Sequence, residues 1–372
     1  MSSAPHEIGP GFTSRLARQA RTVALPGIGK SGAHRLADAR VLVIGAGGLG
    51  SPVLQYLAAS GIGVIGIVDF DTVDITNLQR QVIHRLSDVG MVKTESAARA
   101  ISALDPDVEV VRHDVRLDRD NALEILRGYD IVVDASDNFA TRYLVSDATA
   151  LLRLPCVWGS VLRFDGQLSV SWESAPDHPP VDFRDLYPLP PDPAQVLSCA
   201  EAGVLGSLCG TIGSMMATEV IKLITGVGVP LIGTVQNLDA LSGEWASFVV
   251  RRAPERLPVT ELIDYDEFCG TARPSDAARQ ITAEELGARL AAGAVLIDVR
   301  EPHEHEFGHI EGDRLIPLGV LTAQPALAGD GPVVFYCATG ARSRRAAELL
   351  ASRGVSAVSL RGGYAAWRGS AA

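Results

Sequence analysis

A glycine-rich loop between two hydrophobic segments constrains the fold of this 372-residue chain more than any other feature. Val41–Ile44 is an apolar run short enough for a buried strand. The sequence Gly-Ala-Gly-Gly-Leu-Gly follows at 45–50, where the lack of side chains lets backbone N–H groups approach a phosphate. A helix opens at Ser51, and a second apolar strand, Val64–Val68, leads into Asp69. An acid at this distance can hydrogen-bond ribose hydroxyls, so the stretch predicts an α/β, Rossmann-like unit for an adenine nucleotide. The loop contacts expected with the nucleotide are Gly45, Gly47, Gly48 and Gly50.

The segment after Asp69 indicates which nucleotide binds. The glycine fingerprint alone fits NAD. Arg80 and Lys93 follow it, and cations over a triphosphate can both bind it and stabilise the charge that builds on a departing pyrophosphate. Asn77 could also hydrogen-bond the nucleotide. ATP is therefore expected, and ordinary surface ion pairs are the alternative explanation for the two cations.

A third predicted strand ends in a polar segment that begins at Asp134. Polar residues at the carboxyl end of a parallel strand lie where such sheets bind ligands. Asp137 is a natural Mg²⁺ ligand, because Mg²⁺ is held by one or two carboxylates together with phosphate oxygens. Asp134 and Asn138 could instead simply cap the next helix. Residues 155–170 are predicted to form two strands with a turn at Asp165-Gly166.

Composition narrows the class of protein. The length allows two domains with a large core, and a formal net charge of −11 argues against a nucleic-acid partner. Five cysteines at irregular spacing favour a reducing cytoplasm over a disulfide framework. The N-terminal segment has no apolar core and is not expected to be a signal peptide. The apolar stretch Ala202–Ile221 is long enough for a membrane span but contains Glu219 and internal glycines, so we expect a buried helix of a soluble core and no membrane association.

Five motifs, in this order, resemble those of the MoeB/ThiF family, the bacterial relatives of ubiquitin-activating enzymes. They are GAGGLGS at 45–51, DFD at 69–71, TNLQRQ at 76–81, GMVKTES at 90–96 and SDN at 136–138. The resemblance runs from about Arg15 to Gly270 and implies an ATP-binding adenylation domain with a mixed sheet over residues 1–270. It also implies that Mg-ATP is used to adenylate the C-terminal Gly-Gly carboxylate of a ubiquitin-like sulfur-carrier protein.

The same resemblance assigns roles to single residues. It implies that Asp69 binds the ribose, that Arg80 and Lys93 bind the phosphates, and that Asp137 serves the metal and the reaction centre. Further nucleotide contacts are expected from Asn77, Leu78 and Asn138. Arg18 lies in an Ala-Arg-Gln setting that matches the N-terminal arginine of the family. In the family the partner subunit supplies that arginine to the phosphates, so a homodimer is expected.

The cysteines of this domain bear on two questions, namely whether Cys199 takes part in the reaction and whether the domain holds a structural zinc. Cys199 resembles a family cysteine that can form thioester or disulfide links, and its participation is left open. The other cysteines of the domain, Cys156, Cys209 and Cys269, are expected to be small core residues. Many family members hold a structural zinc with two C-x-x-C pairs, whereas this chain has no C-x-x-C and reads Asp-Phe-Arg-Asp at 182–185, where the first pair would fall. Tetrahedral zinc needs about four Cys or His ligands, so no structural zinc is expected.

A second unit follows a polar linker at 271–280. Thr282 and Glu285 form a predicted capping box for its first helix. A strand at 333–336 delivers Cys337 into a loop that reaches Arg342 at the start of a helix, where converging N–H groups and the helix dipole favour a thiolate. Four residues separate Cys337 from Arg342, whereas Cys-dependent phosphatases of similar shape have five. The tighter loop suits a sulfane sulfur better than a phosphate.

With the pattern DVR…E…F…GHI…G upstream and GGYAAW downstream, residues 281–368 resemble a rhodanese domain, a small α/β sulfurtransferase, and this domain is expected to span 281–372. The resemblance implies a persulfide on Cys337. It also implies that Arg342 steers a sulfur donor such as thiosulfate or a persulfide from a cysteine desulfurase. A buried structural thiol is the alternative for Cys337. The nearby His303, His305 and His309 are interpreted as surface positions rather than metal ligands.

The fusion of the two domains predicts consecutive reactions. The carrier is first adenylated, and the Cys337 persulfide then attacks the acyl carbon, which leads to the carrier thiocarboxylate. A second thiol, either Cys199 or an external reductant, releases the product. Two alternatives come from other classes of protein, a non-catalytic scaffold that binds the carrier and an NAD-dependent oxidoreductase.

Overall fold

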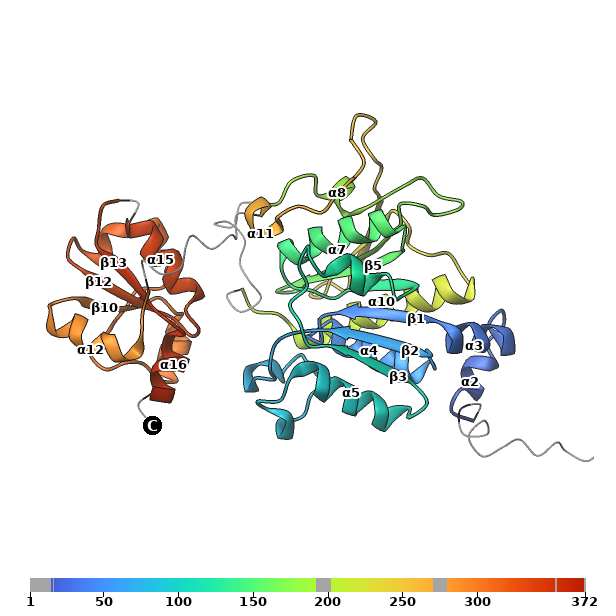
Figure 1. The fold of residues 1–372 in the computed structure, drawn as a ribbon, viewed down its shortest axis with the longest axis horizontal. Coiled ribbons are helices and arrows are strands. Elements are labelled where there is room, and N and C mark those ends of the chain that lie inside the picture. The colour runs from blue at the N-terminus through green and yellow to red at the C-terminus, as the bar shows by residue number, and fades with distance from the viewer. Residues whose placement is uncertain (1–14, 16, 192–201, 270–279, 352, 371–372) are drawn as a thin grey trace, which may run out of the picture. The chain divides into compact units, whose positions relative to one another are not determined.

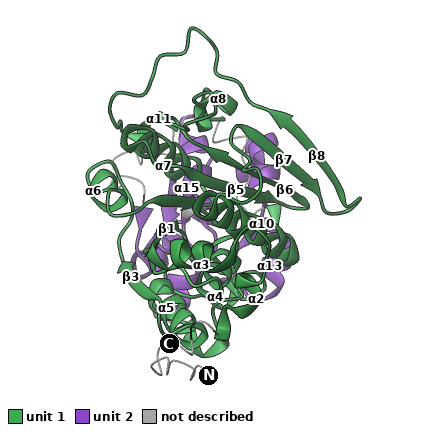
Figure 2. Ribbon diagram, turned by 90° about the vertical axis from the view of Figure 1, so that its right-hand side faces the viewer, with its two compact units in different colours: residues 1–272 green, residues 273–372 purple. Residues whose placement is uncertain are grey.

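The computed structural model describes residue 15 and residues 17–191, 202–269, 280–351 and 353–370. The chain divides into two compact units, Met1–Ala272 and Arg273–Ala372, which Figures 1 and 2 distinguish by label and by colour. Each unit is built on a sheet of its own.

The sheet of the first unit has eight strands in the order β3-β2-β1-β4-β5-β6-β7-β8. Pairing is parallel from β3 to β5 and antiparallel from β5 to β8. The strands are β1 (Arg40–Ile44), β2 (Val64–Val68), β3 (Glu109–His113), β4 (Ile131–Asp134), β5 (Cys156–Leu162), β6 (Asp165–Ser171), β7 (Thr234–Asp239) and β8 (Glu244–Val249). The mixed sheet with a Rossmann-like parallel half is therefore present as predicted.

Helices lie on both faces of this sheet (Figure 1). One core is shared by α3 (Gly29–Asp38), α4 (Gly50–Ala59), α5 (Lys93–Leu104) and α10 (Gly206–Thr225), and the other by α6 (Ala122–Leu126), α7 (Phe139–Leu152), α8 (Phe183–Leu186) and α11 (Tyr265–Phe268). Short elements connect them, namely α2 (Ala20–Val23) and the 3₁₀ turns η1 (Ile75–Asn77) and η2 (Leu86–Asp88). Strand β1 lies between the two cores. Val41 and Val43 pack into the first core, and Leu42 and Ile44 pack into the second. A strand buried on both faces is a continuous apolar run.

Helix α10 covers most of the apolar stretch that resembles a membrane span. Among the described residues it is the one helix long and apolar enough to cross a membrane, and half of its most apolar window is buried. It packs against α4 and β5. Its buried Glu219 lies 2.5 Å from Nζ of Lys222 and accepts a hydrogen bond from the Leu231 N–H at 2.8 Å. The predicted core helix is therefore present.

The β5–β6 hairpin turns earlier than predicted. Leu162 already pairs with Asp165, so Arg163 and Phe164 form the turn, and the prediction of a turn at Asp165-Gly166 is wrong. Arg163 adopts the left-handed conformation that the turn requires, with φ of 55°. Gly166 is needed for packing instead, because a β-carbon there would lie 2.6 Å from a side-chain carbon of Ile212 in α10.

The second unit is a parallel five-stranded sheet in the order β11-β10-β12-β13-β9, flanked by helices. Its elements are β9 (Gln280–Ile281), α12 (Ala283–Ala291), β10 (Val295–Asp298), α13 (Pro302–Glu306), β11 (Arg314–Leu315), α14 (Leu318–Ala323), η3 (Pro325–Ala328), β12 (Val333–Tyr336), α15 (Ala341–Ala351), β13 (Ala357–Leu360) and α16 (Gly363–Ser370). The predicted capping box is confirmed, since the Thr282 N–H donates to the Glu285 carboxylate at 2.7 Å and the Thr282 hydroxyl accepts from the Glu285 N–H at 3.4 Å.

Candidate active site

A cavity of about 590 Å³ opens at the carboxyl ends of the parallel strands of the first unit. The residues that directly follow β1, β2 and β4 line it. In open parallel sheets this edge is where ligands bind, because the loops there diverge around the point where strand order reverses. The cavity brings together most of the predicted site residues: Gly45, Gly47, Gly48, Asp69, Arg80, Lys93, Asp137 and Asn138.

Glycines shape the loop at the end of β1. Gly45 has φ of +94°, which favours glycine, and a β-carbon on Gly50 would lie only 1.9 Å from the Gly45 carbonyl oxygen. Gly50 therefore serves the turn and is not among the residues that line the cavity. Ala46 is held from both sides, since its N–H donates to Asp69 and its carbonyl accepts from Nε2 of buried His84, both at 2.9 Å.

Asp69, which is predicted to bind the ribose, also orders the backbone around the cavity. Its second carboxylate oxygen accepts from the Asp71 N–H at 2.9 Å, so both oxygens order backbone around the cavity. Burial raises the pKa of Asp69 above its ordinary value, and the nearby Lys93 opposes this effect. The carboxylate lines the cavity at the end of β2, which is the position required for a ribose contact.

Lys93 and Arg80 are the cations of the cavity wall that were predicted. Lys93 is the first residue of α5, where the helix dipole disfavours a positive charge. Its side chain is 8% exposed, and Nζ lies 2.8 Å from an Asp71 carboxylate oxygen that offsets this cost. Arg80 donates to the Thr76 carbonyl at 3.3 Å. Both side chains line the cavity, and Lys93 is at the same time in an ion pair with Asp71.

Asn77 and Leu78 lie near the cavity in sequence but are not among the residues that line it. The Asn77 side chain accepts from the Asp74 N–H at 3.3 Å and closes a capping box around η1. In the structure, Asn77 therefore caps η1 and does not line the cavity.

Asn138 caps a helix, whereas Asp137 is exposed at the cavity. Asn138 caps α7, with its side-chain oxygen accepting from the Thr141 N–H at 2.9 Å, as the alternative interpretation proposed. Asp134 does not cap this helix, because its carboxylate accepts from the Ser136 N–H at 2.9 Å in the loop before it. Asp137 is exposed to the cavity. A free carboxylate beside a phosphate loop fits a Mg²⁺ ion that is shared with phosphate oxygens.

Two buried polar residues that line the cavity, Gln81 and Arg142, were not predicted from the sequence. Gln81 is 5% exposed and Arg142 is 6% exposed, and each has a buried polar atom without a hydrogen-bond partner. Both line the cavity. Gln81 ends the TNLQRQ motif and could have been suspected from its place beside Arg80, whereas nothing in the local sequence of α7 marks Arg142.

Arg18 does not line this cavity in its own chain. Arg18 forms ion pairs with Asp105, at 2.7 Å, and with Asp107, beyond the end of α5 that is opposite to Lys93. It is not among the lining residues of its own chain. Cys199 lies outside the described residues. The thiols of Cys156, Cys209 and Cys269 are buried, as predicted, and burial raises the pKa of Cys269 to about 11.

The second candidate site is the loop after β12. Cys337 is 1% exposed, and its Sγ accepts from the Gly340 N–H at 3.1 Å and from the Ser343 hydroxyl at 3.6 Å. Gly363 lets the next loop pass close by, since a β-carbon there would lie 2.2 Å from the Cys337 carbonyl oxygen. The loop thus directs donors at the sulfur, as the helix N-terminus predicts.

Charged residues around this loop are paired. The Arg342 guanidinium donates to both oxygens of Glu304 at 2.6 Å. Burial alone would raise the pKa of Glu304, but the hydrogen bonds from Arg342 and the Glu301 N–H and the nearby arginine charges together outweigh it, and the pKa is lowered. Further on, Nε2 of His305 lies 3.1 Å from Asp313, and the rings of His305 and His309 stack 4.0 Å apart at 7°. One ligand atom each of His305, His309 and Asp313 lies within 4.8 Å of the others, so the interpretation of these histidines as surface positions rather than metal ligands stays a prediction.

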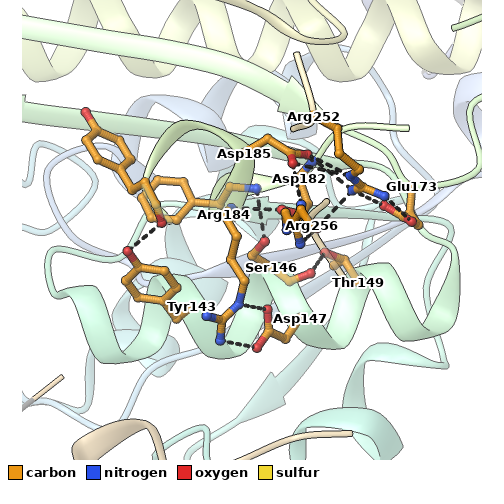
Figure 3. A network of polar contacts seen from close by, with 12 residues as sticks. Tyr143, Ser146, Asp147, Thr149, Glu173, Asp182, Arg184, Asp185, Arg252 and Arg256 are labelled. Atoms are coloured by element: carbon orange, nitrogen blue, oxygen red, sulfur yellow. Dashed lines mark hydrogen bonds and ion pairs between the residues drawn. The ribbon is translucent and has the colours of Figure 1, made fainter. Parts of the chain in front are cut away.

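Ion pairs occupy the region where the zinc ligands of relatives were expected (Figure 3). Asp182 and Asp185, spaced like a C-x-x-C pair, both contact Arg252 at 3.2 Å and Arg256 at 2.5 Å. Arg252 also makes a two-point contact with Glu173 at 2.6 and 2.7 Å. These five residues, the acid–arginine cluster, join α8 to the segment that follows β8.

Comparisons with known proteins match both units of the chain. Residues 19–259 match the ThiF family and residues 282–370 match the rhodanese-like domain. A probable adenylyltransferase/sulfurtransferase, MoeZ of Mycobacterium tuberculosis, is 49% identical over 363 residues, which cover 95% of this chain and 92% of that protein. A sulfur carrier protein adenylyltransferase of Thermus thermophilus is 48% identical over 268 residues, which cover 68% of this chain and 97% of that protein. The crystal structure of Escherichia coli MccB with ATP has a TM-score of 0.56 at 20% identity, over 69% of this chain and 77% of that one, which supports the fold alone.

Proposed function

The chain belongs to the ThiF family, and on that premise we propose which of its residues carry out its two reactions and on what substrate. The protein is an adenylyltransferase and sulfurtransferase. We propose that it adenylates the C-terminal Gly-Gly carboxylate of a ubiquitin-like sulfur carrier and converts it to a thiocarboxylate. The observation that carries this proposal is the cavity in which the glycine loop, the Lys93–Asp71 pair and the free Asp137 carboxylate converge.

In the first reaction, a carboxylate oxygen of the carrier attacks the α-phosphorus of ATP, and the bond to pyrophosphate breaks. Lys93 and Arg80 bind the phosphates and stabilise the charge that develops on the leaving group. Asp69 holds the ribose. Asp137 would hold Mg²⁺, which supplies charge neutralisation between phosphate oxygens when it is bound.

In the second reaction, the terminal sulfur of a Cys337 persulfide attacks the acyl carbon, and AMP leaves. The resulting acyl disulfide is opened by a thiolate that attacks Cys337 Sγ, which releases the carrier thiocarboxylate and leaves Cys337 in a disulfide with the attacking thiol. That thiol is Cys199 or an external reductant, and thiosulfate or a desulfurase persulfide reloads Cys337 after its reduction. The N–H of Gly340 and the hydroxyl of Ser343 donate to Cys337 Sγ, which stays on the enzyme and is the sulfur that the second thiolate attacks.

Arg18 enters this scheme through a second copy of the chain. Its guanidinium is paired with Asp105 and does not line the cavity of its own chain, and the family resemblance implies that this arginine serves the cavity of a partner. We therefore propose a homodimer in which each subunit supplies Arg18 to the other.

The test is carrier adenylation with a matched pair of lysine variants. The full chain is incubated with Mg-ATP, thiosulfate and candidate Gly-Gly carriers, and carrier mass and carrier-dependent exchange of pyrophosphate into ATP are measured. We expect an oxygen-to-sulfur mass gain with one carrier. Lys93→Ala should lower the exchange rate by about 10²- to 10³-fold, the usual loss when a charge-stabilising group is removed. The exposed Lys30→Ala on α3 is the control. Absence of exchange with every carrier, or equal rates for the two variants, would contradict the proposal.

We further propose that the chain holds no structural zinc. Residues 182–185 supply two carboxylates to arginines instead of two thiolates to a metal. Incubation with a strong chelator such as 1,10-phenanthroline, followed by differential scanning calorimetry, should leave the unfolding temperature of the first unit unchanged. Metal analysis of the purified protein should show less than stoichiometric zinc. A chelator-induced fall in that temperature would contradict the proposal.

A further inference from the structure

Arg142 is a buried cation that no acid of the described chain neutralises. It lies in the first turn of α7 and is 94% buried, and none of the ion pairs among the described residues includes it. One terminal nitrogen, Nη2, donates to the Ser136 carbonyl at 2.6 Å. The other, Nη1, is buried and has no hydrogen-bond partner. Because burying a charge without compensation is costly, a guanidinium of this kind indicates an anionic ligand.

The position of Arg142 in the cavity indicates where such an anionic ligand would bind. Arg142 lines it together with Asp137, and the bond to Ser136 holds the guanidinium against the peptide that precedes Asp137. The glycine loop follows β1 and the ribose-binding Asp69 follows β2, whereas Arg142 follows β4 on the other side of β1. With strands about 4.8 Å apart, the ends of β2 and β4 are separated by about 10 Å. Arg142 is thus on the far side of the α-phosphate position from the ribose.

The remaining wall on this side does not resemble a nucleotide site. Ser160, Leu162 and Arg163 from the β5 hairpin line it, together with Tyr187 and Leu189. An acyl group that approaches the α-phosphorus in line with the departing pyrophosphate must enter away from the nucleotide contacts. The planar fork of arginine matches a carboxylate in geometry as well as in charge.

We propose that Arg142 forms a carboxylate subsite, in which Nη1 donates to one oxygen of the carrier's terminal carboxylate and leaves the other oxygen directed at the α-phosphorus. This inference rests on the proposed function, since it names the residue that recognises the acyl substrate. It assigns Arg142 to substrate binding, whereas Lys93 and Arg80 bind the nucleotide.

The experiment compares the acid with its amide. The carrier that supports exchange in the wild type is prepared with a free C-terminal carboxylate and with a C-terminal amide, and binding of each is measured by calorimetry. A charge-assisted hydrogen bond predicts that the wild type prefers the carboxylate by about 10- to 100-fold. Arg142→Gln should show no preference, and in exchange assays its KM for the carrier should rise by the same factor while the KM for ATP stays unchanged. Arg153→Gln, at the exposed end of the same helix, should behave as wild type.

Several outcomes would overturn the inference. Arg142→Gln that keeps the preference, or that raises the KM for ATP alone, would make Arg142 a phosphate ligand or a packing residue. If the glutamine variant fails to fold, Arg142→Lys is used instead, because lysine retains the charge with a single compact donor. If Arg142→Lys prefers the carboxylate as strongly as the wild type does, the preference depends on charge alone and the proposed fork geometry is overturned. If the wild type shows no exchange with any carrier, the proposed function fails as well. Exchange in the wild type with an unaltered Arg142→Gln refutes the subsite alone.

Discussion

Replacing Cys337 by alanine is expected to abolish thiocarboxylate formation and to leave carrier adenylation at the wild-type rate. Sγ of Cys337 is the atom toward which the Gly340 N–H and the Ser343 hydroxyl are directed. Removing a covalent nucleophile removes the reaction path, so the rate of sulfur transfer should fall by at least about 10⁴-fold. The adenylation cavity belongs to the other compact unit and loses no side chain. Carrier mass and pyrophosphate exchange, measured in parallel, report the two reactions separately.

The control for this variant is Cys269→Ala, which removes a buried thiol from the first unit. It should leave both reactions intact. If Cys337→Ala yields as much thiocarboxylate as the wild type, then Cys337 is the buried structural thiol of the alternative interpretation. The calorimetric transition of the second unit must be compared as well, because Cys337 packs in its core.

Replacing Asp185 by asparagine is expected to destabilise the first unit by about 3 kcal/mol at pH 7, the lower end of the usual loss when one partner of a buried ion pair is removed. The Asp185 side chain is fully buried and contacts both arginines of the acid–arginine cluster. Asparagine keeps the shape and still accepts from the Asp182 N–H, so the charge is what is lost. At roughly 2–4 °C per kcal/mol, the unfolding temperature of the first unit should fall by about 6–12 °C in scanning calorimetry.

The pH dependence of this effect has a definite sign. Burial alone would raise the pKa of Asp185, but hydrogen bonds from Arg252 and Arg256 outweigh it, and the pKa is lowered in the folded chain. The ionised group therefore stabilises the fold fully above its unfolded pKa of about 3.9, and this stabilisation is lost as the pH falls through the lower folded pKa. The difference between wild type and Asp185→Asn should be constant above about pH 5 and should shrink in acid.

Glu95→Gln is the matched control, because Glu95 forms an exposed ion pair with Arg99 on α5. Such pairs contribute about 0–1 kcal/mol, so its unfolding temperature should change little. The transition of the second unit should not move in either variant. An Asp185→Asn variant as stable as the wild type at pH 7 would show that the acid–arginine cluster does not hold α8 to the segment after β8.

The sequence alone determined those parts of the protein that depend on short stretches of chain. The apolar run of β1, the glycine loop with Asp69 behind it, and the Thr282 capping box all follow from residues within about 30 positions of one another. Their spacing is set by backbone geometry, and strand and helix periodicities appear directly in the order of residues. The hairpin turn is the exception, because the glycine of Asp165-Gly166 is required by the packing of Ile212 and not by local conformation.

Only the tertiary structure decided how the charged residues are partnered. Asp182 and Arg256 are 74 positions apart, and Arg18 and Asp105 are 87 apart, so no local pattern predicts that they meet. Arg142 and Gln81 look like ordinary polar residues in the sequence, and their role in the cavity depends on which of their polar atoms the packed chain leaves unsatisfied. Partners and burial are properties of the assembled core, because a charge or an amide is costly there only after water has been excluded by segments that come from elsewhere in the chain.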